Sequence, residues 1–150
     1  MPTETILVIE TNVDDLSPEI AGYVQEQALA LGALDVYLTP VQMKKNRPGL
    51  QLTLLARPEQ RDLLVALLLR ETTSLGVRIS AAERIVAERR HELVETAYGP
   101  IRIKVAGESG SAAANAAPEY EDCRTAALRH QVPLKAVYQE ALRAWADRPA

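Results

Sequence analysis

The sequence predicts an α+β protein with a ferredoxin-like βαββαβ core, an added β-hairpin and two C-terminal helices. Up to about residue 80, the segments read strand, helix, strand, strand, helix, strand, which is the doubled split βαβ order. Two further strand-like segments flank a Tyr-Gly-Pro turn, and two proline-started helical segments close the chain. We therefore expect the core and hairpin in residues 1–106, a flexible linker in 107–117, and a helical pair in 118–150.

The first half of the core begins with a buried strand. Residues 5–9 (TILVI) are continuously apolar and rich in β-branched side chains, which is typical of a central strand. Ser17-Pro18-Glu19 then combines a capping serine, a first-turn proline and an acid, so a helix starts there and ends near Gly32. Residues 34–43 return to a strand pattern.

The second half repeats this plan. Residues 46–49 (Asn-Arg-Pro-Gly) predict a turn, and the alternating leucines of 50–54 predict a half-buried strand. Pro58 opens a leucine-rich helix that runs to about Thr72. Gly76 then separates that helix from a strand starting near residue 77.

The C-terminal third contains the hairpin, the linker and the helices. Residues 88–96 and 101–105 flank the hairpin turn, and GESGSAAANAA at 107–117 has the small, polar composition of a mobile linker. Pro118 and Pro133 each open a helix. The last helix has an apolar stripe that predicts docking on the core or on a partner: Leu134, Val137, Tyr138, Ala141, Leu142 and Trp145.

Composition excludes several kinds of function. The chain has 150 residues and a net charge of −3, which argues against broad nucleic-acid binding. The absence of phenylalanine argues against a base-stacking sheet. Cys123 is the single cysteine, so neither an internal disulfide nor a cysteine zinc cluster can form. No signal peptide or membrane-spanning run is visible, and we expect a cytoplasmic protein.

The predicted topology places three polar loops at one end of the sheet. They are residues 10–15, which are acidic, residues 44–49, which are basic, and residues 70–78, which carry hydroxyls between two arginines. A polyphosphate needs fixed cations and a divalent metal, and carboxylates suit Mg²⁺ or Mn²⁺. The sequence therefore predicts a metal–nucleotide site between the acidic and the basic loop.

Each of these groups also has a structural explanation. Asp14 and Asp15 precede a helix start, where the helix dipole favours acids without any metal. The basic tip at 44–47 can be a solvated turn that blocks pairing at the sheet edge. The acids that follow Pro118 are likewise expected in a first helical turn. From the residues alone, both readings stay open.

Five stretches together resemble the C-terminal domain of the LarC family of nickel-insertion proteins. In chain order they are ETNVDDLSPEIAGYV, GALDVYLTPVQMKKNRPG, LLRETTSLGVRI, PEYEDC and VPLKAVYQEAL, which spread from residue 10 to residue 142. The resemblance implies use of CTP with Mg²⁺ or Mn²⁺, and formation of CMP and pyrophosphate. During this reaction, nickel would be placed as a substrate metal into pyridinium-3,5-bisthiocarboxylic acid mononucleotide. The family's histidine-rich N-terminal region has no counterpart here and is an implied partner.

The resemblance and the topology point to the same loops, and we expect these roles. Lys44, Lys45 and Arg47 would hold phosphate oxygens, and Asn46 or Thr72 would contact ribose or base. Asp14, with Glu10 or Asp15, would hold the metal. Arg78 and Arg70 would act catalytically by offsetting charge on the α-phosphate, and Glu119 or Glu121 would read cytosine.

The flat outer face of the sheet and the apolar last helix predict a homo-oligomer. An alternative function is a non-catalytic regulatory module that binds an effector at an oligomer interface, because fold does not fix function. A purely structural role in assembling the missing N-terminal region is a further alternative.

Overall fold

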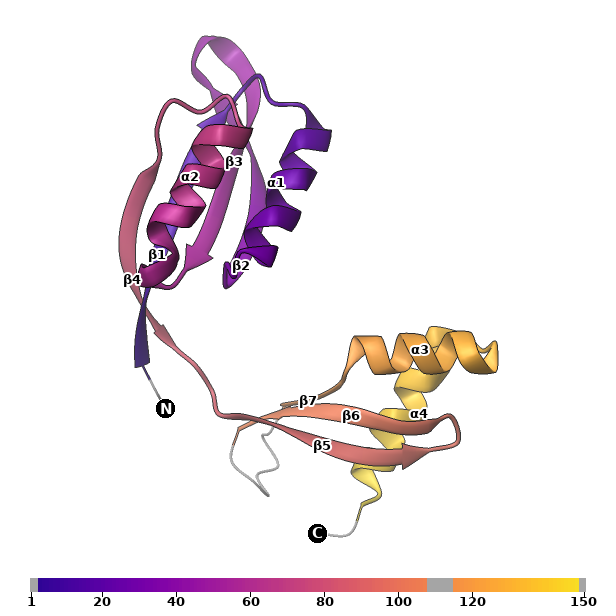
Figure 1. Ribbon diagram of the computed structural model, residues 1–150. Helices are drawn as coiled ribbons and strands as arrows, with labels where there is room; N and C mark the ends of the chain where they lie inside the picture. Colours follow the sequence, from indigo (N-terminus) through magenta and orange to yellow (C-terminus); the bar gives the residue numbers. More distant parts are fainter. Residues whose placement is uncertain (1–2, 108–114, 149–150) are drawn as a thin grey trace. The chain divides into compact units, whose positions relative to one another are not determined.

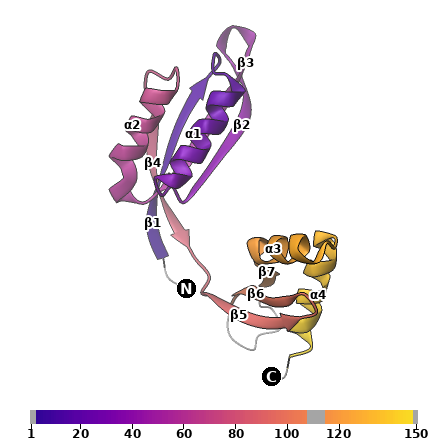
Figure 2. The same ribbon diagram turned by 45° about the vertical axis from the view of Figure 1, so that its right-hand side comes forward.

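The computed structural model describes residues 3–107 and 115–148 and divides the chain into two compact units (Figures 1 and 2). The first unit is Thr3–Ile85, and the second begins at Val86. Each unit has its own sheet, helices and hydrophobic core. The expected core-plus-hairpin of residues 1–106 therefore spans parts of both units.

The first unit is a four-stranded antiparallel sheet in the order β2-β3-β1-β4, which confirms the ferredoxin-like core. Its elements are β1 (Thr3–Val13), α1 (Pro18–Ala30), β2 (Asp35–Met43), η1 (Lys44–Asn46), β3 (Arg47–Ala56), η2 (Pro58–Gln60), α2 (Arg61–Glu71) and β4 (Arg78–Ile85). Helix α1 starts as predicted, because the Ser17 hydroxyl accepts a hydrogen bond from the Glu19 amide at 3.2 Å.

Both helices cover the same face of this sheet. Ile9 of β1 and Leu54 of β3 are fully buried beneath Val24 of α1 and Leu64 and Leu68 of α2. Each fully buried side chain of this size contributes about 1.5–3 kcal/mol. The packed layer therefore holds the strand ends, and with them the loops that follow, in fixed positions.

The tip of the β2–β3 hairpin differs from the predicted turn at 46–49. The chain reverses in a short 3-10 turn over Lys44–Asn46, and β3 already begins at Arg47, which pairs with Met43. Pro48 fits in the strand because β1 pairs with β3 only from Leu50 onward, so this part of β3 has just one neighbour.

The second unit builds a three-stranded antiparallel sheet and two helices. Its elements are β5 (Arg89–Thr96), β6 (Gly99–Ala106), β7 (Asn115–Pro118), α3 (Tyr120–His130) and α4 (Leu134–Ala146), with the strands in the order β5-β6-β7. The predicted hairpin is confirmed as β5–β6. It packs on the C-terminal helices because Ile101, Ile103 and Val105 are buried in one cluster with Val137 and Ala141.

Two expectations for this region need correction. Residues 115–117 of the expected linker belong to β7, while residues 108–114 lie outside the described part of the chain. Pro118 does not open a helix: it ends β7 opposite Ile103, and α3 starts at Tyr120. A proline is accepted there because β7 lies at the edge of its sheet. In the described residues, no helix is long and apolar enough to span a membrane.

Candidate functional site

The structure brings parts of the three predicted polar segments together at one end of the first unit. The acidic segment is only partly a loop, because residues 10–13 belong to β1 and pair with β3, so Asp14 and Asp15 alone follow the strand. Arg47 Nη1 of the hairpin donates to Asp14 Oδ2 of the loop after β1 at 3.4 Å. The hydroxyl of Thr73, which follows α2, donates to Asp15 Oδ1. We call this cluster, comprising Asp14–Asp15, Lys44–Arg47 and Thr72–Val77, the charged rim.

Hydroxyl groups fasten the third loop of the charged rim to the sheet. The Thr72 hydroxyl donates to the Leu68 carbonyl at 2.6 Å and accepts from the Ser74 amide at 3.1 Å. The Thr11 hydroxyl, on β1, donates to the Gly76 carbonyl at 3.1 Å and also contacts the Ser74 hydroxyl. Only Thr72 of these hydroxyls was a predicted site residue, and its oxygen is already engaged within the loop.

The hairpin tip is held in an unusual backbone conformation. Lys45 and Asn46 are consecutive left-handed residues, with φ of 59° and 57°. For a residue with a Cβ this conformation costs roughly 1–2 kcal/mol, and only asparagine tolerates it well. The Gln42 side chain donates to Asn46 Oδ1 at 3.0 Å and braces the turn. Backbone strain of this kind clusters at functional sites.

The two lysines of the tip give the rim positive charge that can bind anions. Both are exposed, and within the described residues neither forms an ion pair with a carboxylate. Gly49 fixes the base of the tip, because a Cβ there would lie 2.6 Å from the Val13 carbonyl oxygen. The tip is therefore a close-fitting part of the sheet that presents two ammonium groups to solvent.

A second polar network lies further down β1. Glu10 Oε1 accepts from the Gln51 side chain, and Arg78 Nε lies 3.9 Å from Glu10 Oε2. Arg78 Nη2 also donates to Asn12 Oδ1 at 2.6 Å, so the Arg78 side chain extends along β1 toward the charged rim. Sequence reasoning missed Asn12 and Gln51, although they alternate with buried residues on their strands.

These carboxylates fit a metal only in part. In the described residues, no group of three or more His, Cys, Asp or Glu side chains is close enough to hold an ion. Four residues of extended chain separate Glu10 from Asp14, about 13 Å, so the two cannot share one ion. Asp14 and Asp15 are adjacent, and Mg²⁺ is often held by one or two carboxylates together with phosphate oxygens and water. The rim thus fits a metal that arrives with a polyphosphate.

The remaining predicted residues are not part of this cluster. Arg70 Nε, on the last turn of α2, pairs with Glu71 at 2.7 Å. Glu119 and Glu121 belong to the second unit, at the start of α3. Glu119 Oε1 lies 3.0 Å from His91 Nε2 and 3.4 Å from Lys104 Nζ, and the hydrogen bond with His91 is the main cause that lowers the pKa of this carboxyl.

Comparison with known proteins identifies relatives over nearly the whole chain. The family model described as nickel insertion protein matches residues 1–138. A putative nickel insertion protein of Nostoc sp. (strain PCC 7120 / SAG 25.82 / UTEX 2576) is 45% identical over 95% of this chain. A pyridinium-3,5-bisthiocarboxylic acid mononucleotide nickel insertion protein of Thermotoga petrophila is 43% identical over 94% of it. The chain spans only 34% and 35% of the length of these two relatives.

Solved structures give the same result. LarC2, the C-terminal domain of a cyclometallase involved in the synthesis of the NPN cofactor of lactate racemase, matches with a TM-score of 0.91 and 41% identity, over 97% of this chain and 100% of that one. A protein of Methanopyrus kandleri AV19 shares the fold, with a TM-score of 0.67 and 22% identity over 95% of this chain and 90% of that one. This chain belongs to the nickel insertion protein family and corresponds to its C-terminal LarC2 domain.

Proposed function

We propose that the charged rim binds the triphosphate of CTP together with Mg²⁺ or Mn²⁺. The chain would then be the nucleotide-binding domain of an enzyme that converts CTP to CMP and pyrophosphate. During that conversion, nickel would be placed into pyridinium-3,5-bisthiocarboxylic acid mononucleotide. The observation that carries the proposal is the contact between Asp14 and Arg47, because it puts an acidic loop beside a lysine-bearing tip.

The cations of the rim would hold the phosphate oxygens. Lys44 and Lys45 supply compact charges on a backbone turn whose position is fixed by β2 and β3. Arg47 pairs with Asp14 at a long distance, and its side chain is 58% exposed. An exposed pair of this kind is worth about 0–1 kcal/mol, so Arg47 is easily transferred to a phosphate.

Asp14, with Asp15 beside it, would hold the divalent ion, and its carboxylate is free to do so once Arg47 moves to a phosphate. The bound ion supplies neutralisation of the triphosphate charge. Asp15 keeps the Thr73 hydroxyl as a partner, which ties the loop after α2 to the same site. Glu10 instead positions Arg78, since both belong to one network with Asn12.

Arg78 and Arg70 remain the proposed catalytic residues. The guanidinium of Arg78 is 60% exposed, donates to Asn12 and lies 3.9 Å from Glu10, so it is available to offset charge as pyrophosphate leaves. Arg70 would reach the site only by leaving Glu71. Asn46 is the proposed ribose or base contact, because its side chain lies on the tip between Lys45 and Arg47.

The complete reaction requires more than this chain. The relatives are about three times as long, and we propose that their N-terminal region delivers nickel as the substrate metal and contributes to the bound mononucleotide. Assembly into a homo-oligomer is also part of the proposal.

Isothermal titration calorimetry with CTP and Mn²⁺ tests the proposed site. Lys44→Ala and Asp14→Asn should each weaken binding at least about tenfold, because each removes a charged partner of the metal–triphosphate complex. Lys135→Ala, a surface lysine of the second unit, is the matched control and should leave binding unchanged. No heat with the native chain refutes the proposal. Release of bound CTP unchanged by the full-length enzyme favours the regulatory alternative.

A further inference from the structure

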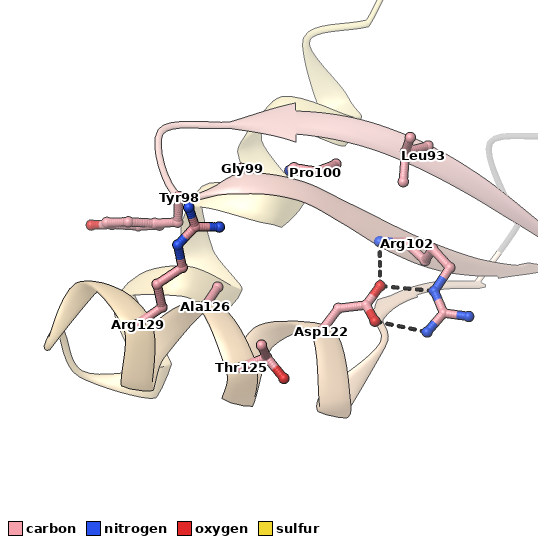
Figure 3. A pocket seen from close by; sticks show the side chains of 9 residues that line it. All are labelled: Leu93, Tyr98, Gly99, Pro100, Arg102, Asp122, Thr125, Ala126 and Arg129. Atoms are coloured by element: carbon pink, nitrogen blue, oxygen red, sulfur yellow. Dashed lines mark hydrogen bonds and ion pairs between the residues drawn. The ribbon is translucent and has the colours of Figure 1, made fainter.

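The second unit contains a hollow to which the proposed function assigns no ligand. It lies between the β5–β6 hairpin and the outer side of α3 and has a volume of about 370 Å³ (Figure 3). This volume falls at the small end of the range for ligand sites in proteins. Its lining combines apolar side chains, most of them from the hairpin, with charged side chains from both the hairpin and the helix.

One ion pair in the hollow is fully satisfied. Asp122 of α3 accepts from the Arg102 backbone amide at 3.0 Å, from its Nε at 2.9 Å and from its Nη2 at 2.7 Å. These bonds lower the pKa of the Asp122 carboxyl, with the side-chain hydrogen bond from Arg102 as the largest cause. The pair contributes no net charge, and it fixes one end of the hollow in a rigid bidentate geometry.

Arg129 then gives the hollow its net positive charge. Its side chain reaches from α3 toward the turn at Tyr98 and Gly99 (Figure 3). Within the described residues it forms no ion pair, in contrast to Arg102 at the other end. Thr125, one turn earlier on the same helix, also lines the hollow, with its hydroxyl turned away from the hairpin (Figure 3). The planar guanidinium of Arg129 suits a carboxylate-type anion.

The opposite wall suits a flat apolar ring. Leu93 of β5 is 63% exposed and lies in the lining with Pro100 and Tyr98. The Tyr98 ring is held edge-on by His130, with 5.6 Å between ring centroids. The apolar Leu93 and Pro100 and the guanidinium of Arg129 line the same hollow, which matches a ligand that has both an apolar face and an anionic edge.

We propose that this hollow binds a planar ring that carries carboxylate-type anions, with Arg129 on an anionic group and Leu93 and Pro100 against the ring. Resting on the proposed function, the ligand is the pyridinium ring of the bis-thiocarboxylate mononucleotide, whose two thiocarboxylates provide the anionic edge. The second unit would then hold the nickel acceptor, while the first unit holds CTP.

Amide NMR with the probe pyridine-3,5-dicarboxylate tests this inference. Titration into the native chain should shift amides of β5, β6 and α3, and the neutral analogue pyridine-3,5-dicarboxamide should bind at least about tenfold more weakly. Arg129→Met should weaken dicarboxylate binding by a similar factor. Arg124→Met changes an exposed arginine of the same helix that does not line the hollow, and it should bind like the native chain.

Three results would overturn the inference: no shifts, shifts confined to Thr3–Ile85, or equal losses for Arg129→Met and Arg124→Met. A CTP and Mg²⁺ titration of the same sample is read at the amides of the charged rim. If CTP shifts amides of the charged rim but the dicarboxylate shifts no amides around the hollow, only this inference is refuted. A chain that binds the dicarboxylate in the hollow but does not bind CTP removes the nucleotide proposal instead.

Discussion

Replacement of Lys45 by glycine should improve folding and impair binding at the same time. Lys45 has φ of 59°, where a side chain costs roughly 1–2 kcal/mol, while glycine loses roughly 0.5–1 kcal/mol more backbone entropy on folding. The difference predicts that Lys45→Gly gains up to about 1.5 kcal/mol, or a rise in Tm of up to about 10 °C for a unit of this size. Loss of the ammonium should weaken CTP binding about tenfold and CMP binding much less.

Lys45→Ala is the matched control, because it removes the same charge and keeps the Cβ. It should bind CTP as weakly as Lys45→Gly without the gain in stability. Thermal unfolding followed by circular dichroism reports both units, whereas fluorescence of the single tryptophan, Trp145 in α4, reports the second unit. Unchanged CTP affinity, or equal losses for CTP and CMP, refutes the phosphate role of Lys45. A lower Tm for Lys45→Gly than for Lys45→Ala refutes the strain argument.

Three further outcomes follow from packing and charge. Gly49→Ala should destabilise the chain by about 1–3 kcal/mol in urea unfolding, since its Cβ would meet the Val13 carbonyl oxygen at 2.6 Å, whereas Gly22→Ala, with nothing within 4 Å, should be neutral or stabilising. Cys123 is fully buried and its pKa is raised by burial, so a thiol reagent should label it only on unfolding; rapid labelling of the native chain contradicts this. The pKa of Asp122 is lowered in the folded chain, so this carboxylate contributes stability above about pH 4, and that contribution is lost as the pH falls through the lowered pKa. Asp122→Asn should therefore be less stable than the native chain at pH 7. It should also lose less stability than the native chain when the pH is lowered. An unaltered acid dependence would count against that assignment.

The sequence predicts the fold well where the signal is local. Alternating leucines identify β3, and Ser17-Pro18 identifies the start of α1, because side-chain periodicity and capping act within a few residues. β7 was missed because Asn115–Pro118 is a strand only through its pairing with β6, which no local pattern reveals. The same reason explains why the hairpin was grouped with the ferredoxin-like core: its unit depends on which helices cover Ile101 and Ile103.

The candidate site shows the same division. The topology alone predicts that the segments at 10–15, 44–49 and 70–78 share one end, because each follows an element that runs toward that end. It places the end of the first strand too early, since residues 10–13 belong to β1. It does not predict that Thr73 binds Asp15, or that the turn places Lys45 and Asn46 in the left-handed region. Those details depend on side-chain rotamers and on the register of β2 against β3. The proline–glycine pair places the predicted turn at 46–49, which begins two residues after the observed turn at Lys44–Asn46.

The choice between lysine and arginine supports an anion site at the tip. Arginines elsewhere in the described chain are mostly engaged with carboxylates, as Arg84 is with Glu4 and Arg143 with Glu140. Their planar donors suit such pairs, whereas an ammonium is a compact charge that keeps its hydration until a ligand replaces it. Lys44 and Lys45 form no such pair, although Asp14 lies within reach of the neighbouring Arg47. The available acid is taken by an arginine, so within the described residues the two adjacent lysines have no carboxylate partner on a turn braced by Gln42, and this supports the proposed triphosphate site.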